Sequence, residues 1–453
     1  MEQRTIAAIA TPLGEGSIAT VRISGQDAPQ VVDRIFKSVS GKKVASLAGY
    51  TALYGSVYSG EKIIDNAVVL NFKAPKSYTG ENVVEISVHG GRIVIKNVLR
   101  AALDAGAFLA EPGEFTKRAF LNGKLDLVEA EAVMGIISAH SKAELDLSFS
   151  SLSGKVSSQI NDIKEKLVEA AASIAFFADY PDEELPELNN QNFYKMLNVA
   201  HQSLNDMLSN FDAGKILREG VDTAIVGKPN VGKSTLMNLL SHKNRSIVTE
   251  IAGTTRDIIE DTVMVGDVML NLADTAGIHK TDDVVESVGV KLAQEKKNTA
   301  QLILAVFDLS RQLDDNDLEL LNSIKGKNAI VVLNKTDISG NVPQGVFEGF
   351  KTVLVSAKNG LGEQELVNAI AEITKVSSIN PDSAVLGSER QRGCALRASS
   401  AISAAINALE SGTTIDAVGV CIDDALAALY ELTGERATNT VTNEIFKRFC
   451  VGK

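Results

Sequence analysis

The feature that most constrains the fold of this 453-residue chain is one glycine-containing run, Gly227–Ser234, with the sequence Gly-Lys-Pro-Asn-Val-Gly-Lys-Ser. It follows an apolar stretch, Thr223–Val226, that is typical of a buried strand, and it precedes a stretch that predicts a helix. At such a junction the glycines let backbone N–H groups close around phosphate oxygens, while Lys233 supplies positive charge and Ser234 can ligate Mg²⁺. A glycine-rich turn can match the pattern by chance, but the strand–loop–helix context favours a phosphate-binding loop.

The segment around this loop alternates predicted strands and helices, which is typical of a doubly wound α/β domain. The predicted strands are Thr223–Val226, Ile258–Val265, Val268–Ala273, Leu302–Asp308, Ala329–Leu333 and Thr352–Val355. Besides the phosphate-binding loop, polar motifs follow three more of these strands, where a parallel sheet binds its ligands.

These motifs suit a guanine nucleotide. Asp274–Gly277 (Asp-Thr-Ala-Gly) places a carboxylate near Mg²⁺ and the Gly277 N–H near a γ-phosphate. In Asn334–Asp337 (Asn-Lys-Thr-Asp) the Asp337 carboxylate can accept hydrogen bonds from guanine N1–H and the exocyclic amine. Adenine would leave that carboxylate unpaired, so the site can discriminate by about 10⁴ or more. Ser356–Lys358 (Ser-Ala-Lys) fits a backbone loop that contacts guanine O6, and we therefore predict GTP, not ATP.

A switch loop is expected between the phosphate-binding loop and Asp274–Gly277, in Asn244–Asp257, which ends Gly-Thr-Thr-Arg-Asp. Its Thr255 hydroxyl is the candidate Mg²⁺ ligand beside Ser234, with Asp274 acting through water; an ordinary solvated loop is the alternative. The candidate GTP-binding residues are Gly227, Asn230, Val231, Gly232, Lys233, Ser234, Thr235, Thr249, Thr254, Thr255, Asp274, Thr275, Ala276, Gly277, Asn334, Lys335, Asp337, Ser356, Ala357 and Lys358.

The rest of the chain has a different texture. Residues 1–119 alternate short β-rich runs with turns, around a helical run at Ile93–Ala105, and predict an α+β domain. Residues 120–216 and 376–453 show apolar side chains at helical spacing, with Gly434 as a C-cap of the last long helix. We therefore predict a multidomain protein: an α+β N-terminal domain, a discontinuous all-α domain, and a Ras-like α/β P-loop GTPase domain inserted at residues 217–375.

Composition limits the function classes. A net charge of −12 argues against a generally basic, nucleic-acid-coating surface. Three widely spaced cysteines suit a reducing compartment, not a disulfide framework. The first residues carry no secretory pattern and no apolar run is long enough to cross a membrane, so we expect a cytoplasmic protein with no membrane partner.

The whole chain closely resembles the MnmE (TrmE) family of tRNA-modification GTPases. Besides the GTPase motifs, the matching segments are Val21–Gly25, Tyr78–Glu81, His89–Gly91, Pro112–Phe115, Arg118–Leu125 and the terminal Cys450–Lys453 (Cys-Val-Gly-Lys). The last segment is the most diagnostic, because other GTPases that share the Pro-Asn-x-Gly-Lys-Ser loop do not end in this way.

The resemblance implies a function in tRNA modification. Such proteins work as homodimers, through the N-terminal domain, with an FAD-dependent partner subunit. Together they add an aminomethyl or carboxymethylaminomethyl group to C5 of the wobble uridine of certain tRNAs. The one-carbon donor would be 5-formyl- or methylene-tetrahydrofolate, bound by Arg22, Glu81, Lys124 and Lys453. Cys450 is the candidate thiol beside it; surface ion pairs and an idle thiol are the alternatives.

The resemblance also implies how GTP is hydrolysed. Ile278 stands where many GTPases have a water-orienting Gln, and no arginine finger is apparent. The family uses K⁺ instead, here with Asn230, Thr249, Ile251 and Thr254 as candidate ligands. Glu286 resembles the family's water-orienting acid, although it could be an ordinary exposed helical Glu. The candidate catalytic residues are Glu286, Lys233, Thr255 and Arg256 of a GTP hydrolase that acts on an acid anhydride.

Two other functions remain open from the sequence. A ribosome-assembly GTPase would share the phosphate-binding loop, although such proteins usually append a basic RNA-binding module. A purely conformational switch would use the helices to transmit GTP-driven closure and would leave the chemistry to a partner.

Overall fold

The computed structural model describes residues 4–179, 190–242, 261–272, 300–338, 345–378 and 383–453. The chain forms two compact units, each built from separate parts of the sequence. The first contains Met1–Met134, Ser157–Ala200 and Arg397–Lys453, and the second contains Gly135–Val156 and His201–Leu396. No helix among the described residues is both long and apolar enough to cross a membrane.

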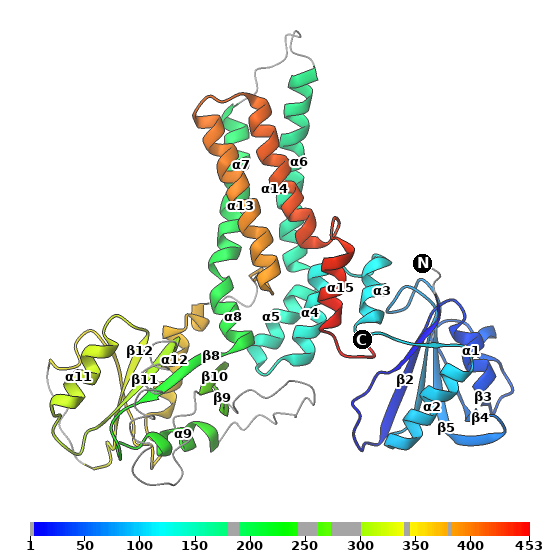
Figure 1. Ribbon diagram of the computed structural model, residues 1–453, viewed down its shortest axis with the longest axis horizontal. Helices are drawn as coiled ribbons and strands as arrows, with labels where there is room; N and C mark the ends of the chain where they lie inside the picture. The colour runs from blue at the N-terminus through cyan, green and yellow to red at the C-terminus, as the bar shows by residue number, and fades with distance from the viewer. Residues whose placement is uncertain (1–3, 180–189, 243–260, 273–299, 339–344, 379–382) are drawn as a thin grey trace. The chain divides into compact units, whose positions relative to one another are not determined.

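The first unit contains a seven-stranded sheet in the order β3-β4-β5-β6-β2-β1-β7. Its strands are β1 Ile6–Ile9, β2 Ile18–Ser24, β3 Phe36–Ser38, β4 Thr51–Ser59, β5 Lys62–Phe72, β6 Val83–His89 and β7 Phe108–Leu109. The helices α1 Ala28–Ile35 and α2 Arg92–Asp104 pack on one face of this sheet (Figure 1). Alternate side chains of the strands, such as Val21, Val57 and Val69, form the core beneath them.

The opposite face of the same sheet is covered only in part. Near β1, Phe115 of α3 Glu114–Leu121 is fully buried against Ile6 and Ala8. On β4 and β5, by contrast, Tyr54 and Val68 lie directly opposite each other and are 58% and 43% exposed. In the part of the chain that the structure describes, the β4–β5 end of this face is therefore largely bare.

Long helices form the remainder of the first unit, and four of them cross its limits in the sequence. They are α4 Leu127–Ser138, α6 Lys155–Asp179, α7 Asn190–Ser209, α13 Glu389–Glu410, α14 Ile415–Thr433 and α15 Asn439–Lys447. Figure 1 shows α6, α7, α13 and α14 side by side. Ion pairs and close contacts join helices from the two sides of the insertion, as between Lys164 and Glu435 or between Tyr194 and Glu410. The expected discontinuous helical domain is confirmed.

The second unit is built around a six-stranded sheet in the order β13-β12-β11-β8-β10-β9, parallel except for β9. Its strands are β8 Val221–Val226, β9 Asp261–Val265, β10 Val268–Leu272, β11 Leu302–Asp308, β12 Ala329–Asn334 and β13 Lys351–Leu354. Its helices are α5 Lys142–Leu152, α8 Phe211–Glu219, α9 Lys233–His242, α11 Asp315–Ile324 and α12 Glu363–Ile373. Every residue of β11 is buried, as expected for a central strand with both faces covered.

Helix α5, expected in the all-α segment 120–216, and α8, which spans the predicted limit at residue 216, share a core with this sheet. Leu147 of α5 and Leu217 of α8 lie in the same buried cluster as Val221 and Ile225 of β8. The domain limits at residues 119, 216 and 375 stay predictions. The fold class does not depend on them: an α+β N-terminal domain, a discontinuous helical domain and an inserted α/β domain.

Candidate functional site

The phosphate-binding loop lies where the sequence predicted it, between β8 and α9. Gly227 and Gly232 have φ of 153° and 98°, which favour glycine. A Cβ at Gly227 would lie 2.5 Å from the Val306 carbonyl oxygen, and one at Gly232 would lie 2.2 Å from Asn334 Nδ2. The loop is therefore packed too closely for side chains at these positions, so that its backbone lines the site.

The polar side chains of the loop suit a nucleotide polyphosphate and a hard cation. Lys233 Nζ donates hydrogen bonds to the carbonyl oxygens of Gly227 and Lys228, at 2.7 and 2.8 Å, and burial lowers the pKa of Lys233. Its ammonium thus lies at the mouth of the loop, where phosphate oxygens can accept from it. Ser234 and Thr235 are exposed at the start of α9, and Asn230 is exposed with a φ of 64°. Their oxygens are of the kind that Mg²⁺ and K⁺ prefer.

The base-recognition motif at the end of β12 is tied to this loop. Asn334 is buried; its Nδ2 donates to the Val231 carbonyl at 2.9 Å, and its Oδ1 accepts from the Ala357 N–H at 3.0 Å. Asn334 therefore joins three loops, and the Ala357 amide is engaged with it. This role goes beyond the base contact that the motif suggested.

Asp337 presents an exposed carboxylate beside these loops. The Ser356 hydroxyl donates to Asp337 Oδ1 at 2.7 Å, and this hydrogen bond lowers the pKa of Asp337. An ionised acceptor at this position suits the two N–H donors on the edge of guanine. Lys358 is exposed on the same loop as Ser356.

Several candidate residues lie outside the described residues. They are Thr249, Ile251, Thr254, Thr255, Arg256, Asp274, Thr275, Ala276, Gly277 and Glu286. The proposed switch loop, the water-orienting acid and most of the K⁺ ligands therefore stay predictions.

The sequence motifs did not point to Asp308 or Lys228, two charged residues beside this site. Lys335 Nζ lies 2.6 Å from the buried carboxylate of Asp308, at the end of β11, and Lys228 is ion-paired with Asp314. A polar residue that ends a fully buried strand was a usable signal for Asp308, because ligands of parallel sheets bind at that edge. No local pattern indicates the Lys228 pair.

A second cluster of candidate residues lies on the N-terminal sheet, where the C-terminal segment folds back. Arg22 Nη1 donates to the Gly452 carbonyl at 3.3 Å, across 430 positions of sequence. The backbone N–H groups of Gly113 and Phe115 donate to the carbonyls of Cys450 and Lys453, at 3.4 and 3.2 Å. The structure thus brings the terminal Cys-Val-Gly-Lys segment onto β2 and the start of α3.

This second site is cationic and aromatic. The Arg22 guanidinium lies over the rings of Tyr78 and Phe115, with its carbon 5.5 and 5.7 Å from the centroids, and pairs with Glu85 at 2.8 Å. Burial, followed by the charge of Arg22, lowers the pKa of Lys453. Two cations beside the partly exposed Tyr78 ring fit a ligand that carries a planar ring and carboxylates.

The other candidate folate residues lie near this cluster, but not all of them are free. Glu81 accepts from Ser24 Oγ at 2.7 Å and pairs with Arg118 at 3.0 Å, so the expected alternative of an ion pair is present there. Lys124 packs against Gly80, where a Cβ would lie 3.4 Å from Lys124 Cγ. The Cys450 thiol is free and exposed.

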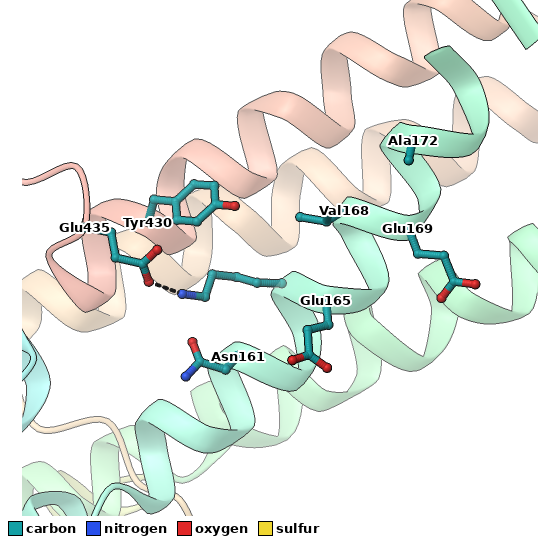
Figure 2. Close-up of a pocket in the computed structure, with 8 residues that line it drawn as sticks. Asn161, Glu165, Val168, Glu169, Ala172, Tyr430 and Glu435 are labelled. Atoms are coloured by element: carbon teal, nitrogen blue, oxygen red, sulfur yellow. Dashed lines mark hydrogen bonds and ion pairs between the residues drawn. The ribbon is translucent and has the colours of Figure 1, made fainter. Parts of the chain in front are cut away.

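A groove of about 520 Å³ lies apart from these residues, between α6 and the end of α14 (Figure 2). It is lined by Asn161, Lys164, Glu165, Val168, Glu169, Ala172, Tyr430 and Glu435. Three carboxylates make it unsuited to phosphates, and none of the candidate site residues that the structure describes lines it.

Comparisons with known proteins agree with these features. Residues 5–124 match the family described as GTP-binding protein TrmE N-terminus, and residues 127–450 match the MnmE helical domain. The tRNA modification GTPase MnmE of Acetivibrio thermocellus is 39% identical over 100% of both chains. That of Lactococcus lactis subsp. cremoris is 40% identical over 99% of this chain and 98% of its own. Among solved structures, Era of Aquifex aeolicus bound to GDP·AlF4⁻ is 30% identical, with a TM-score of 0.27 over 40% of this chain and 66% of that chain. Full-length identity of this degree, together with both family matches, shows that the chain belongs to the MnmE family of tRNA modification GTPases.

Proposed function

We propose that this GTPase, with an FAD-dependent partner subunit, adds an aminomethyl or carboxymethylaminomethyl group to C5 of the wobble uridine of certain tRNAs. The one-carbon donor is 5-formyl- or methylene-tetrahydrofolate. The observation that carries the proposal is the meeting of Arg22, Lys453 and the aromatic rings of Tyr78 and Phe115 beside the exposed Cys450 thiol.

Each residue of this cluster suits a part of a folate. Tyr78 is partly exposed and offers an apolar face near a planar pteridine, whereas Phe115 is buried and packs against Arg22. Burial raises the pKa of Tyr78, so that its hydroxyl stays protonated at neutral pH. Arg22 and Lys453 hold carboxylates through charge-assisted hydrogen bonds. Glu81 and Lys124 contact the edges of the pteridine ring. Because Glu81 is ion-paired with Arg118, only the part of its carboxylate that Arg118 leaves free is available for this contact. The bound folate supplies the carbon that is transferred.

GTP binding and hydrolysis belong to the second unit. Lys233 and the loop amides hold the β- and γ-phosphates, and Asp337 selects guanine. Ser234 and Thr255 ligate Mg²⁺, with Asp274 acting through water, and Asn230 supplies a K⁺ ligand together with Thr249, Ile251 and Thr254. K⁺ supplies positive charge where other GTPases use an arginine finger. Glu286 orients the attacking water.

A second copy of this chain covers the bare end of the N-terminal sheet. Tyr54 and Val68 form an exposed apolar pair there, because their side chains lie on the side of the sheet that faces away from the core of this chain. Apolar side chains exposed side by side on a sheet face are typical of an interface. A homodimer would bury them.

Calorimetry with 5-formyl-tetrahydrofolate tests the folate site in the full-length protein. Arg22→Ala and Lys453→Ala each remove a cation, and we expect binding to weaken at least tenfold, or about 1.4 kcal/mol. Lys447→Ala is the matched control, because Lys447 is exposed and pairs with Glu444 at 2.7 Å on α15. Undiminished binding in both site variants would exclude the folate site.

Nucleoside analysis and GTPase rates test the rest of the proposal. Cells without this protein should lack the wobble-uridine modification, and the wild-type gene should restore it. K⁺ should accelerate GTP turnover far more than Na⁺ does, and Asn230→Ala should abolish the difference. Equal rates in the two salts would rule out the cation model, while intact modification in the deletion strain would favour a ribosome-assembly or switch function.

A further inference from the structure

We propose that the segment from Asp308 to Asp317, named here the 308–317 bracket, positions the phosphate-binding loop and the base-recognition loop for guanine nucleotide binding. The bracket contains none of the GTPase motifs. The inference rests on the proposed guanine site, whose Lys233 and Asp337 lie on the two loops that the bracket holds.

The place of the bracket follows from the sheet order. β11 lies between β8, which leads into the phosphate-binding loop, and β12, which leads into the base-recognition loop. Asp308 ends β11 and pairs in register with Asn334, and the Leu309 N–H donates to the Asn334 carbonyl at 3.0 Å. The chain that leaves β11 therefore emerges between the two nucleotide loops.

On the base side, both oxygens of the Asp308 carboxylate are used. Oδ1 accepts from the Ser310 hydroxyl and N–H, at 2.6 and 2.9 Å, and Oδ2 accepts from Lys335 Nζ at 2.6 Å. Burial raises the pKa of Asp308, but the hydrogen bonds outweigh it and leave the pKa below its usual value. Lys335 has a φ of 66°, a conformation that costs a lysine energy, so an anchor for its side chain helps to hold it.

On the phosphate side, Lys228 makes the connection. Its ammonium is ion-paired with Asp314 and lies 3.6 Å from Asp317, which is 1% exposed. Arg311 grips the Asp317 carboxylate with two hydrogen bonds, at 2.8 and 3.1 Å. Asp314 also caps α11, since it accepts from the N–H groups of Asn316 and Asp317.

The position of Lys228 links this network to phosphate binding. Its carbonyl oxygen is one of the two acceptors of Lys233 Nζ. A shift of Lys228 would therefore move Lys233 as well. Loops held in their binding geometry lose less entropy on binding, so that both anchors should raise nucleotide affinity.

An exposed ion pair elsewhere on the same sheet provides a matched control. Lys351 on β13 pairs with Glu372 on α12, with 44% and 67% of their side chains exposed. This pair touches neither nucleotide loop, and surface pairs of this kind contribute little. Lys351→Met should leave GDP binding unchanged.

The experiment measures binding of a fluorescent GDP analogue, GTP turnover and thermal unfolding in the full chain. Asp308→Asn keeps the shape of the side chain but removes its charge; we expect about tenfold weaker GDP binding, a raised KM and an unchanged kcat. Lys228→Met should weaken binding about tenfold and also lower kcat, because Lys233 is displaced. Lys228→Arg keeps the charge and should restore most of both losses.

Double variants separate positioning from simple stability. Asp308→Asn in a Lys335→Met background should add no further loss of GDP affinity, because the partner is already missing. Wild-type GDP binding in Asp308→Asn and Lys228→Met would overturn the bracket. The bracket would also be overturned if the losses of GDP affinity were fully additive in the double variant and proportional to the drop in unfolding temperature.

Asp337→Asn distinguishes failure of the bracket from failure of the guanine site. If Asp337→Asn loses the preference for GTP over ATP while both bracket variants bind normally, only the bracket fails. If the wild-type protein shows no such preference, the guanine site fails and the bracket fails with it.

Discussion

Asn334 shows how much a single side chain can contribute to the nucleotide site. It links Val231 of the phosphate-binding loop to Ala357, and both of these partners are buried. Asn334→Ala leaves a buried carbonyl and a buried N–H unpaired, at about 1–3 kcal/mol each. We expect the free energy of unfolding, measured by urea denaturation with GDP present or absent, to fall by about 2–6 kcal/mol, and GDP to bind more weakly. Asn368→Ala, on the exposed surface of α12, is the control and should change the free energy of unfolding by about 0.5 kcal/mol or less. If the two variants lower the free energy of unfolding equally, Asn334 does not link the two loops.

Lys453 makes a prediction about pH. Its pKa is lowered by burial and then by Arg22, from an ordinary value of about 10.4. The ammonium is therefore lost at a lower pH than that of an ordinary lysine. Binding of 5-formyl-tetrahydrofolate should weaken as the pH rises in the wild type, whereas Lys453→Arg, whose charge persists, should hold its affinity to higher pH. Calorimetry from pH 7 to 10 measures both, and parallel curves would contradict the assignment.

At the scale of the secondary-structure element, Gly434 ends α14 with a φ of 92°. A Cβ there would lie 2.7 Å from Leu127 Cβ and 2.9 Å from the Phe120 ring, so Gly434→Ala adds a clash to backbone strain. We expect it to lower the free energy of unfolding by about 2–4 kcal/mol. Gly412→Ala isolates the strain, at about 1–2 kcal/mol, because Gly412 has a φ of 67° and open space around it. Denaturant unfolding of both variants measures the difference, and equal losses would show that the clash is relieved.

The sequence predicted most elements of the α/β sheet and less of what packs on it. The predicted Leu302–Asp308 strand has the observed bounds, because a long apolar run between turns leaves few alternatives. For residues 1–119 the sequence predicted β-rich runs without placing each strand, because strands of two to four residues, such as β1, β3 and β7, show too little alternation. An apolar helix face indicates that a partner exists but not which one, and so α5 was not expected to share a core with the sheet.

In the candidate sites, too, the residues that belong to a local motif were predicted, and those defined by a long-range contact were missed. Lys233 and Asp337 were found from local motifs, and the C-terminal segment was placed beside Arg22 by resemblance. Asp308 and Lys228 were missed because their partners, Lys335 and Asp314, are 27 and 86 positions away in the chain. Spacing within a motif carries no information about contacts of that kind.

At the scale of the whole molecule, the bare end of the N-terminal sheet makes the last prediction. Tyr54 and Val68 face away from the core that lies beneath α1 and α2, and a second copy of the chain is the proposed cover. The double variant Tyr54→Glu, Val68→Glu places two charges where that interface would exclude water, so dimerisation should be lost. Sedimentation velocity should show a dimer for the wild type and a 48.1 kDa monomer for the variant. Val420→Glu, at a 62% exposed position on α14, is the control and should stay dimeric. If the double variant stays dimeric, the interface lies on another surface of the chain. If the wild type is monomeric, the homodimer is not part of the proposed function.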